Sequence, residues 1–259
     1  MCSLWGWFNV RFPDIESRVE LLKHLARKGQ TRGEDSYSAA YMNGSDVKAV
    51  RGIGPASKWL HNKPRQVARV AKSNIVLGHN RAASHGPITL ANAHAFHVGR
   101  WICSHNGTMY GTSDLMVRSK FVPKGETDSE EGLCYLADQE MRPEAFALLR
   151  GSWAWSILSD DGGTLLLARN ALSPLAIARV EGGLAWHSLG TALETSLQAI
   201  GIQAEVQELE PYKLLRWPDD EVSDIPTPEK DQGLLNYGGH IIARTEGRTT
   251  LNEEDCCER

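Results

Sequence analysis

The order of apolar and polar residues predicts a chain of short strands with a few helices between them. Residues 3–10 alternate bulky apolar with smaller or polar side chains, which predicts a strand that begins beside Cys2. In residues 14–29 the apolar positions recur on one helical face, so this segment is predicted to be a helix. Asp14 is suited to cap its start, and Gly29 to end it.

The same patterns continue along the chain and indicate an α+β fold. Helices are predicted near 129–149 and 191–201. Further strands are predicted at 36–42, 47–53, 74–80, 100–105, 153–158, 164–170, 175–180, 183–188, 204–209 and 212–217. Many closely spaced strands with short turns predict two mostly antiparallel sheets that pack together and are covered by helices. No glycine-rich phosphate-binding pattern follows a strand, so nothing indicates a nucleotide fold.

Composition indicates a globular protein of the cytoplasm. The chain has 259 residues, of which 41% are hydrophobic and 23% charged, as in water-soluble domains. It contains no apolar run long enough to cross a membrane and no secretory signal pattern, so no membrane association is expected. The five cysteines are irregularly spaced, which argues against a secreted disulfide framework and favours a reducing compartment.

The charge of the chain is unevenly distributed. Residues 218–259 contain 11 acidic and 4 basic residues, a balance of −7, so residues 1–217 carry +3 of the net −4. The sequence therefore predicts a domain over 2–217 and an acidic extension over 218–259 that is a candidate docking arm. A net negative charge argues against direct nucleic-acid binding.

Cys2 is a candidate N-terminal nucleophile. Removal of Met1 would leave a thiol and a free α-amine on one residue, with reference pKa values of about 8.5 and about 7.7–8.0. The amine could act as the base that activates the thiol. A single cysteine at this position is more often an ordinary small residue, so the interpretation depends on what other segments supply.

Asn106 and Gly107 could supply an oxyanion hole for that nucleophile. The asparagine amide and the glycine backbone N–H are donors for a developing negative charge, and glycine has no Cβ to obstruct them. An Asn-Gly pair is also typical of a two-residue hairpin turn. The apolar run at 100–105 directly before it favours donors held by a strand.

Two charged residues could recognise a free amino acid. The guanidinium of Arg81 suits an α-carboxylate, and the carboxylate of Asp128 suits an α-amine. Each has an ordinary alternative, because Arg81 could be a surface charge and Asp128 or Thr127 could cap a helix.

Histidines are concentrated in one part of the sequence, and they raise the possibility of a metal site. They are His79, His85, His94, His97 and His105. The tight Cys/His spacing of zinc sites is missing, so we expect neither a metal nor another cofactor. His85 and His94 are better interpreted as supports around a pocket.

Taken in order, these segments resemble the glutaminase domain of class II glutamine amidotransferases, a branch of the N-terminal nucleophile hydrolases. MCSLWGWF is similar to the opening MCGIxG of that family, and RGEDSYS (32–38) to its RGxDSxG. GHNRAASHG (78–86) is similar to GHTRWATHG, NAHAF (92–96) to NAHPH, SHNGTMYG (104–111) to the HNG segment and TDSE (127–130) to SDTE. RGSWAWSIL (150–158) and ARNALSPLAIA (168–178) carry weaker matches.

The resemblance implies a four-layer αββα sandwich and a role for each matched residue. It implies Cys2 as nucleophile with its own α-amine as base, a thioester intermediate, and glutamine as substrate. The other implied roles are Asn106 and Gly107 for the oxyanion, Arg81 for the carboxylate, Asp128 for the amine, Ser84 and His85 as pocket lining, and Arg32, Asp35 and His94 as supports.

Three functions compete for this chain. The first is a stand-alone glutaminase subunit that supplies ammonia to a separate synthase, expected because only a short segment follows Trp217. The second is an amidase of a γ-glutamyl compound or another small amide, which Ala82 favours because the family commonly has Trp or Tyr there. The third is a catalytically silent binding relative. The stretch 52–66 matches no family pattern and is a candidate lid over the site.

Overall fold

The computed structural model describes residues 1–117, 119–227, 234–237 and 240–243, and its contacts divide the chain into two units. The first unit is Met1–Pro226 and the second is Thr227–Arg259. In the second unit, strands β14 (Leu234–Tyr237) and β15 (His240–Ala243) pair antiparallel. The rest of the predicted acidic extension beyond 227 lies outside the described residues.

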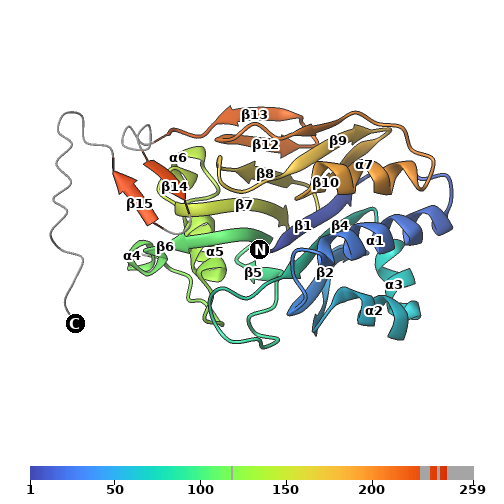
Figure 1. Ribbon diagram of the computed structural model, residues 1–259, viewed down its shortest axis with the longest axis horizontal. Helices are drawn as coiled ribbons and strands as arrows, with labels where there is room; N and C mark the ends of the chain where they lie inside the picture. Colours follow the sequence, from blue (N-terminus) through green and yellow to red (C-terminus); the bar gives the residue numbers. More distant parts are fainter. Residues whose placement is uncertain (118, 228–233, 238–239, 244–259) are drawn as a thin grey trace, which may run out of the picture. The chain divides into compact units, whose positions relative to one another are not determined.

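The first unit is built on two antiparallel sheets (Figure 1). The seven-stranded sheet has the order β11-β9-β10-β1-β4-β2-β3. Its strands are β1 (Ser3–Phe8), β2 (Ser36–Asn43), β3 (Asp46–Ile53), β4 (Ile75–Arg81), β9 (Ala176–Val180), β10 (Gly183–His187) and β11 (Val206–Glu208). The first strand of the chain is therefore central, with β10 on one side and β4 on the other.

The six-stranded sheet has the order β13-β12-β8-β7-β6-β5. Its strands are β5 (Phe96–Val98), β6 (Trp101–Tyr110), β7 (Arg150–Ser159), β8 (Leu165–Arg169), β12 (Lys213–Trp217) and β13 (Glu221–Asp224). Because β13 pairs with β12, the first unit extends past the predicted domain boundary at 217.

Seven helices of the described chain cover the outer faces of the sheets (Figure 1). On the seven-stranded sheet lie α1 (Ile15–Gln30), α2 (Ala56–Asn62), α3 (Pro64–Ala71) and α7 (Gly190–Gln198). With the six-stranded sheet lie α4 (Thr112–Met116), α5 (Asp128–Asp138) and α6 (Pro143–Phe146). The result is the predicted four-layer αββα sandwich.

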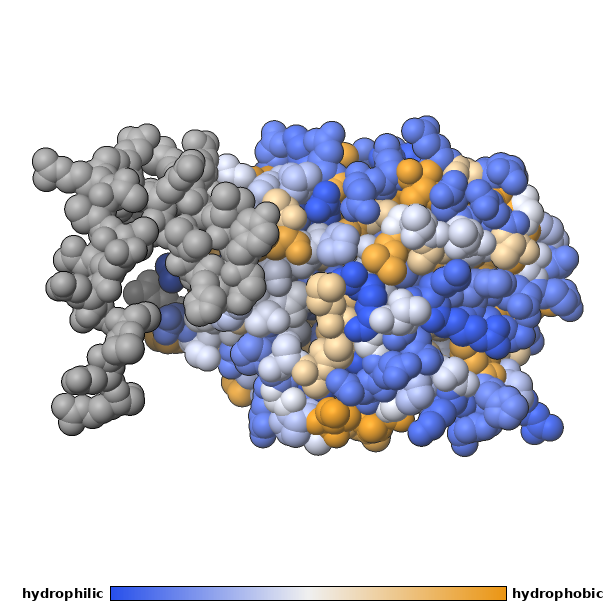
Figure 2. Space-filling view, viewed as in Figure 1, coloured by the Kyte–Doolittle hydropathy of each residue, from blue (hydrophilic) through white to orange (hydrophobic). Residues whose placement is uncertain are grey.

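Three apolar cores hold the layers together, and strand β1 joins two of them. Trp5 and Trp7 pack with the helices of the seven-stranded sheet, whereas Leu4 and Phe8 pack between the sheets with residues such as Leu158. A third core lies between the six-stranded sheet and its helices. This alternation explains why β1 is buried on both faces. The surface in view is mostly hydrophilic, with apolar residues in small groups (Figure 2).

Several sequence predictions need correction in detail. The helix predicted over 129–149 is two helices, because Glu140 and Met141 adopt positive φ angles that interrupt it. The stretch 52–66, the candidate lid, contains α2 and the start of α3, and these helices pack against α1 through buried residues including Trp59 and Val67. No helix in the described part of the chain is long and apolar enough to cross a membrane.

Candidate active site

Cys2 directly precedes β1, a strand that contacts β6 of the other sheet (Figure 1). Its side chain is 8% exposed, while Met1 before it is 82% exposed. The thiol Sγ is 3.4 Å from both the backbone N–H and the carbonyl oxygen of Ala82. Arg32 Nε donates a 2.8 Å hydrogen bond to the Cys2 carbonyl, which fixes the backbone at the chain start.

The surroundings of Cys2 have opposing effects on its thiol. Burial raises the pKa of Cys2 above its usual value, and this effect is the largest. The Ala82 N–H, the positive chain terminus and Arg81 lower that pKa, whereas Asp128 raises it. While Met1 is attached, Cys2 therefore favours the protonated thiol. The charges of Arg81 and Asp128 therefore act on the thiol in opposite directions.

Arg81 ends β4 and is 3% exposed, so it is not the surface charge of the alternative interpretation. Its guanidinium donates to the carbonyl oxygens of His85, Gly86 and Pro87 and thereby folds the loop after β4. Burial lowers the pKa of Arg81, while Cys2, Asp35 and Asp128 raise it. Arg81 therefore has a structural task in addition to its position near the thiol.

Asp128 opens α5, directly after the capping residue Thr127. Thr127 Oγ1 accepts from the Glu130 N–H at 3.2 Å, so Thr127, not Asp128, caps the helix. Asp128 Oδ2 accepts from the Met109 N–H at 2.7 Å, and Oδ1 accepts from the Ser129 N–H at 2.9 Å. These bonds join α5 to strand β6 and hold the carboxylate beside the segment that carries Asn106.

Asn106 and Gly107 lie inside strand β6 and do not form a hairpin turn, because β6 continues to Tyr110 in register with β7. Asn106 Nδ2 donates to Ser188 Oγ at 3.4 Å, and the same oxygen accepts from the Leu4 N–H at 2.9 Å. Ser188 thus links Asn106 to Leu4 of β1, which lies two residues after Cys2.

Gly107 occupies a backbone position that only glycine suits. Its φ angle is +146°, and a Cβ built there would lie 2.0 Å from the Ser152 carbonyl oxygen. The strand pair β6–β7 therefore approaches too closely at this point for any side chain.

Asp35 holds the loop between β4 and the exposed Ser84. Its Oδ2 accepts from the Ala83 N–H at 2.7 Å, and its own N–H donates to the Arg81 carbonyl at 3.0 Å. Ser84 Oγ accepts from Thr108 Oγ1 at 3.3 Å, which connects this loop to β6. The His85 side chain is exposed. The His85 backbone carbonyl accepts a hydrogen bond from Arg81, while the side chain makes no hydrogen bond to the described residues.

His94 lies with two other buried imidazoles behind the site. The rings of His79 and His94 stack with centroids 3.9 Å apart, and His79 Nε2 bonds to the His105 carbonyl at 3.0 Å. His105 Nδ1 lies 2.8 Å from Ser129 Oγ. Burial lowers the pKa of His79 to about 3 and that of His105 to about 4, and it holds the pKa of His94 well below its usual value.

The buried histidines are also candidate metal ligands in the sequence. No group of three or more His, Cys, Asp or Glu side chains in the described residues could hold a metal ion. The imidazoles are instead neutral polar groups inside the sandwich, with their ring nitrogens partly paired to β6 and α5.

The structure also includes site residues that sequence reasoning missed. Ser188, Ser129 and the backbone of Ala82 and Met109 all bond to predicted site residues. Ser129 lies within the matched segment TDSE (127–130). Ser188 follows β10, far along the chain in a segment with no matched motif, so only the fold could identify it.

Comparison with known proteins relates residues 1–159 to a family described as glutamine amidotransferases class-II. The chain is 26% identical over 276 residues to glutamine–fructose-6-phosphate aminotransferase (isomerizing) of Lactococcus lactis, covering 98% of this chain and 40% of that protein. It is 31% identical over 205 residues to the Bradyrhizobium diazoefficiens protein of the same name, covering 74% of this chain and 32% of that one. The chain thus spans less than half of these relatives.

Solved structures share the fold. A glutamine phosphoribosylpyrophosphate amidotransferase from B. subtilis superposes with a TM-score of 0.67 at 17% identity, covering 88% of this chain and 50% of that one. A glutamine aminotransferase class-II domain protein from Silicibacter pomeroyi has a TM-score of 0.56 at 18% identity, covering 88% of this chain and 100% of that one. The match with this chain therefore extends over the whole of the Silicibacter pomeroyi chain.

Proposed function

Because the chain belongs to the class-II glutamine amidotransferase family, we propose that it is a glutaminase whose nucleophile is Cys2. One observation carries the proposal: a buried thiol at the start of the central strand lies within the electrostatic reach of both Arg81 and Asp128. A free amino acid carries one negative and one positive group, and this pair of charges complements both. The family match supports glutamine as that amino acid.

The reaction starts when Met1 is removed and Cys2 gains a free α-amine. The amine takes the thiol proton, and the thiolate attacks the side-chain amide carbon of glutamine. The Asn106 amide and the Gly107 N–H stabilise the oxyanion that forms. When the carbon–nitrogen bond breaks, the amine returns its proton to the leaving nitrogen, and ammonia departs from a γ-glutamyl thioester.

Water completes the cycle. The α-amine accepts a proton from a water molecule that attacks the thioester, and the thiolate leaves as glutamate forms. Arg81 binds the α-carboxylate and Asp128 the α-amine of the substrate throughout, so that the side-chain amide stays at the sulfur. Arg32 and Asp35 keep the chain start and the loop after β4 in place through the Cys2 carbonyl and the Ala83 N–H. Ser84 and His85 line the entrance.

We propose further that the ammonia passes to a separate synthase in the cytoplasm. The fold of this chain fills the whole of the Silicibacter pomeroyi chain, which is consistent with a glutaminase unit that occurs without a fused synthase. The acidic segment after the first unit is the proposed docking arm. Removing residues 227–259 keeps β13 in place, so glutamine hydrolysis should persist while transfer to the acceptor falls.

The alternative substrate is a γ-glutamyl compound or another small amide. Ala82 contacts the thiol through its backbone and presents only a methyl group at a position where an aromatic ring would fill space. A substrate with a larger group on the amide nitrogen would use that space.

The deciding experiment measures ammonia and glutamate release from glutamine by protein that begins at Cys2, with Cys2→Ser as the control. Release of both products in equal amounts, lost in Cys2→Ser, supports the glutaminase. Faster cleavage of N-substituted γ-glutamyl amides than of glutamine supports the alternative. No cleavage of any of these amides by folded protein contradicts both and leaves a silent binding relative.

A further inference from the structure

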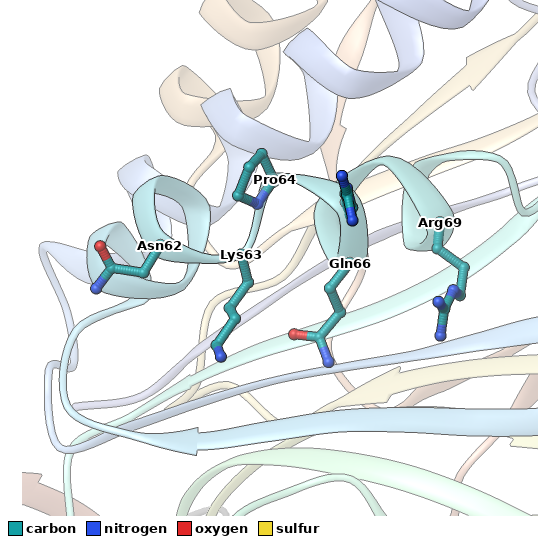
Figure 3. A pocket seen from close by; sticks show the side chains of 6 residues that line it. Asn62, Lys63, Pro64, Gln66 and Arg69 are labelled. Atoms are coloured by element: carbon teal, nitrogen blue, oxygen red, sulfur yellow. The ribbon is translucent and has the colours of Figure 1, made fainter.

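A concave basic surface lies where α2 and α3 meet, in the stretch that matched no family pattern. Residues Asn62, Lys63, Pro64, Arg65, Gln66 and Arg69 line a cavity of about 450 Å³ there. Lys63 directly precedes α3, and its side chain points the same way as those of Gln66 and Arg69 on the helix (Figure 3). We call this set, together with Arg65, the α3 cluster.

The positive charge of the α3 cluster has no partner in the described residues. The sequence contains no aspartate or glutamate between Asp46 and Asp114. Neither Lys63, Arg65 nor Arg69 makes an ion pair or a side-chain hydrogen bond with any residue that the structure describes. All three are exposed, so they are free to meet a ligand from solvent.

The cations of the α3 cluster have opposing effects on the helix, because Arg69 in the last turn stabilises it whereas Arg65 in the first turn does not. Arg65 and Arg69 are four residues apart on α3, a spacing at which like charges destabilise a helix by about 0.2–0.5 kcal/mol. The first turn of α3 has no acidic residue, although a helix start favours negative charge. A bound anion would relieve the repulsion between Arg65 and Arg69 and would suit the start of the helix.

The surface beneath the α3 cluster is rigid. Trp59, Val67 and Val70 are buried against the core, so α2 and α3 have fixed positions. Trp59 Nε1 donates to Gln66 Oε1 at 2.9 Å, and the Trp59 ring stacks on Tyr37 with centroids 5.5 Å apart. The indole N–H occupies the side-chain oxygen of Gln66, so the side-chain NH₂ group remains available as a hydrogen-bond donor for a ligand.

We propose that the α3 cluster binds a ligand that carries two adjacent phosphate groups. Two guanidinium forks, an ammonium and an amide donor match the many oxygens of a diphosphate, and the hollow that they line is open to solvent. A protein partner fits less well, because interface cores are enriched in Tyr, Trp and Phe, and the one such residue of α2 and α3, Trp59, is buried. The site is separate from the proposed glutaminase centre.

Calorimetry with inorganic pyrophosphate at physiological salt tests the site, using full-length protein. We expect saturable binding of one pyrophosphate per chain, weakened at least about tenfold in the double variant Lys63→Ala/Arg69→Ala. The matched control is Lys124→Ala/Arg150→Ala, which removes the same charge from exposed positions outside the cluster and should bind normally. ADP distinguishes the source: binding equal to pyrophosphate indicates recognition of the diphosphate alone, and tighter binding indicates a nucleotide.

Three outcomes would overturn the proposal. They are the absence of saturable pyrophosphate binding, equal weakening in the control variant, and displacement of pyrophosphate by poly-glutamate at similar concentration, which would indicate a docking surface for acidic protein. Thermal unfolding of each variant checks the fold. Since no residue of the cluster contacts the glutaminase centre, the binding result stands whether or not glutamine is hydrolysed.

Discussion

The reactivity of the Cys2 thiol depends on the balance between its burial and the charges beside it. Burial is the larger effect and raises the pKa of Cys2. In protein that retains Met1, we therefore expect iodoacetamide to alkylate Cys2 more slowly at neutral pH than free cysteine, whose pKa is about 8.5. The rate should still increase at pH values where free cysteine has reached its plateau. Mass spectrometry of Cys2 peptides over a pH series measures this.

Cys103 and Cys134 provide the internal control for that experiment. Both are fully buried, and burial raises the pKa of Cys134 to about 12. They should remain unlabelled in folded protein. Alkylation of Cys2 at the rate of free cysteine near neutral pH would contradict the effect of burial.

Substitution of Asn106 should affect a different kinetic constant from substitution of Arg81 or Asp128. Asn106→Ala should lower kcat about a hundredfold with little change in KM, because its amide stabilises charge that appears only in the transition state. Asn106 is held by Ser188, so Ser188→Ala should lower kcat in the same direction but less. Steady-state kinetics with glutamine tests both, and a pure KM effect of Asn106→Ala would refute the oxyanion role.

Arg81→Ala and Asp128→Asn should instead raise KM for glutamine strongly, since a charged group of the substrate loses its partner. Asp128→Asn is the sharper variant, because an amide oxygen can still accept from the Met109 N–H that the carboxylate holds. Arg81→Lys keeps the charge but loses the three-carbonyl contact with the following loop. If Asp128→Asn binds glutamine normally by calorimetry, the assignment to the α-amine fails.

Sequence reasoning proposes residues whose chemical type is informative and misses those that act through position. A thiol, a guanidinium and a carboxylate indicate chemistry by themselves, and in the structure the charges of Arg81 and Asp128 both affect the pKa of Cys2. Ser188 is one serine among many, and Ala82 contributes only its backbone. Their contacts depend on strand pairing between distant segments, which a local pattern does not contain.

At the scale of elements, β6 differs most from what its local sequence indicates. An Asn-Gly pair favours a turn, but β6 continues through it because β7 supplies ten paired positions along its length. The α2–α3 region was missed for a related reason: its helices are short, and their apolar residues pack on α1 without a long helical repeat. Tertiary packing thus overrode local preference in both places.

The close pairing of β6 and β7 gives a prediction for Gly107. Gly107→Ala should destabilise the protein by clearly more than Gly201→Ala, although both glycines have positive φ. At Gly201 nothing lies within 4 Å of the added Cβ. The loss of stability there should be only the cost of holding alanine at a positive φ angle, about 1 kcal/mol. At Gly107 the Cβ also meets the Ser152 oxygen at 2.0 Å.

Urea unfolding of the two alanine variants measures the difference. Gly107→Ala should additionally lower kcat, because separating β6 from β7 moves the neighbouring Asn106. Equal loss of stability in both variants would show that β6 relaxes freely around a side chain, and the oxyanion segment would then be less rigid than its register implies.

At the scale of the molecule, both sheets bury neutral histidines. His79 on β4 stacks on His94 and bonds to His105 on β6, so the two sheets meet through imidazoles as well as through the apolar core. The layered architecture was predictable from strand alternation and the family resemblance. This polar contact was not, because the spacing of the histidines in the sequence suggested a metal site as readily as a support.

The buried histidines predict how the stability of the whole protein depends on pH. Burial lowers the pKa of His79 to about 3 and of His105 and His187 to about 4, from 6.5 in the unfolded chain. Below pH 6.5 these histidines are therefore protonated in the unfolded chain but still neutral in the folded protein. The free energy of unfolding consequently falls as pH drops toward about 4. Each such histidine contributes a slope of up to about 1.4 kcal/mol per pH unit.

Urea unfolding at fixed pH values between about 6.5 and 5 isolates this effect, since carboxylates titrate mostly below that window. His187→Gln should reduce the slope by about one proton, because His187 is buried and lies outside the proposed catalytic groups. His61→Gln makes the same substitution at an exposed position of α2 and is the matched control. A stability that stays constant over this window, or an equal change in both variants, would mean that the imidazoles between the layers accept protons without opening the sandwich.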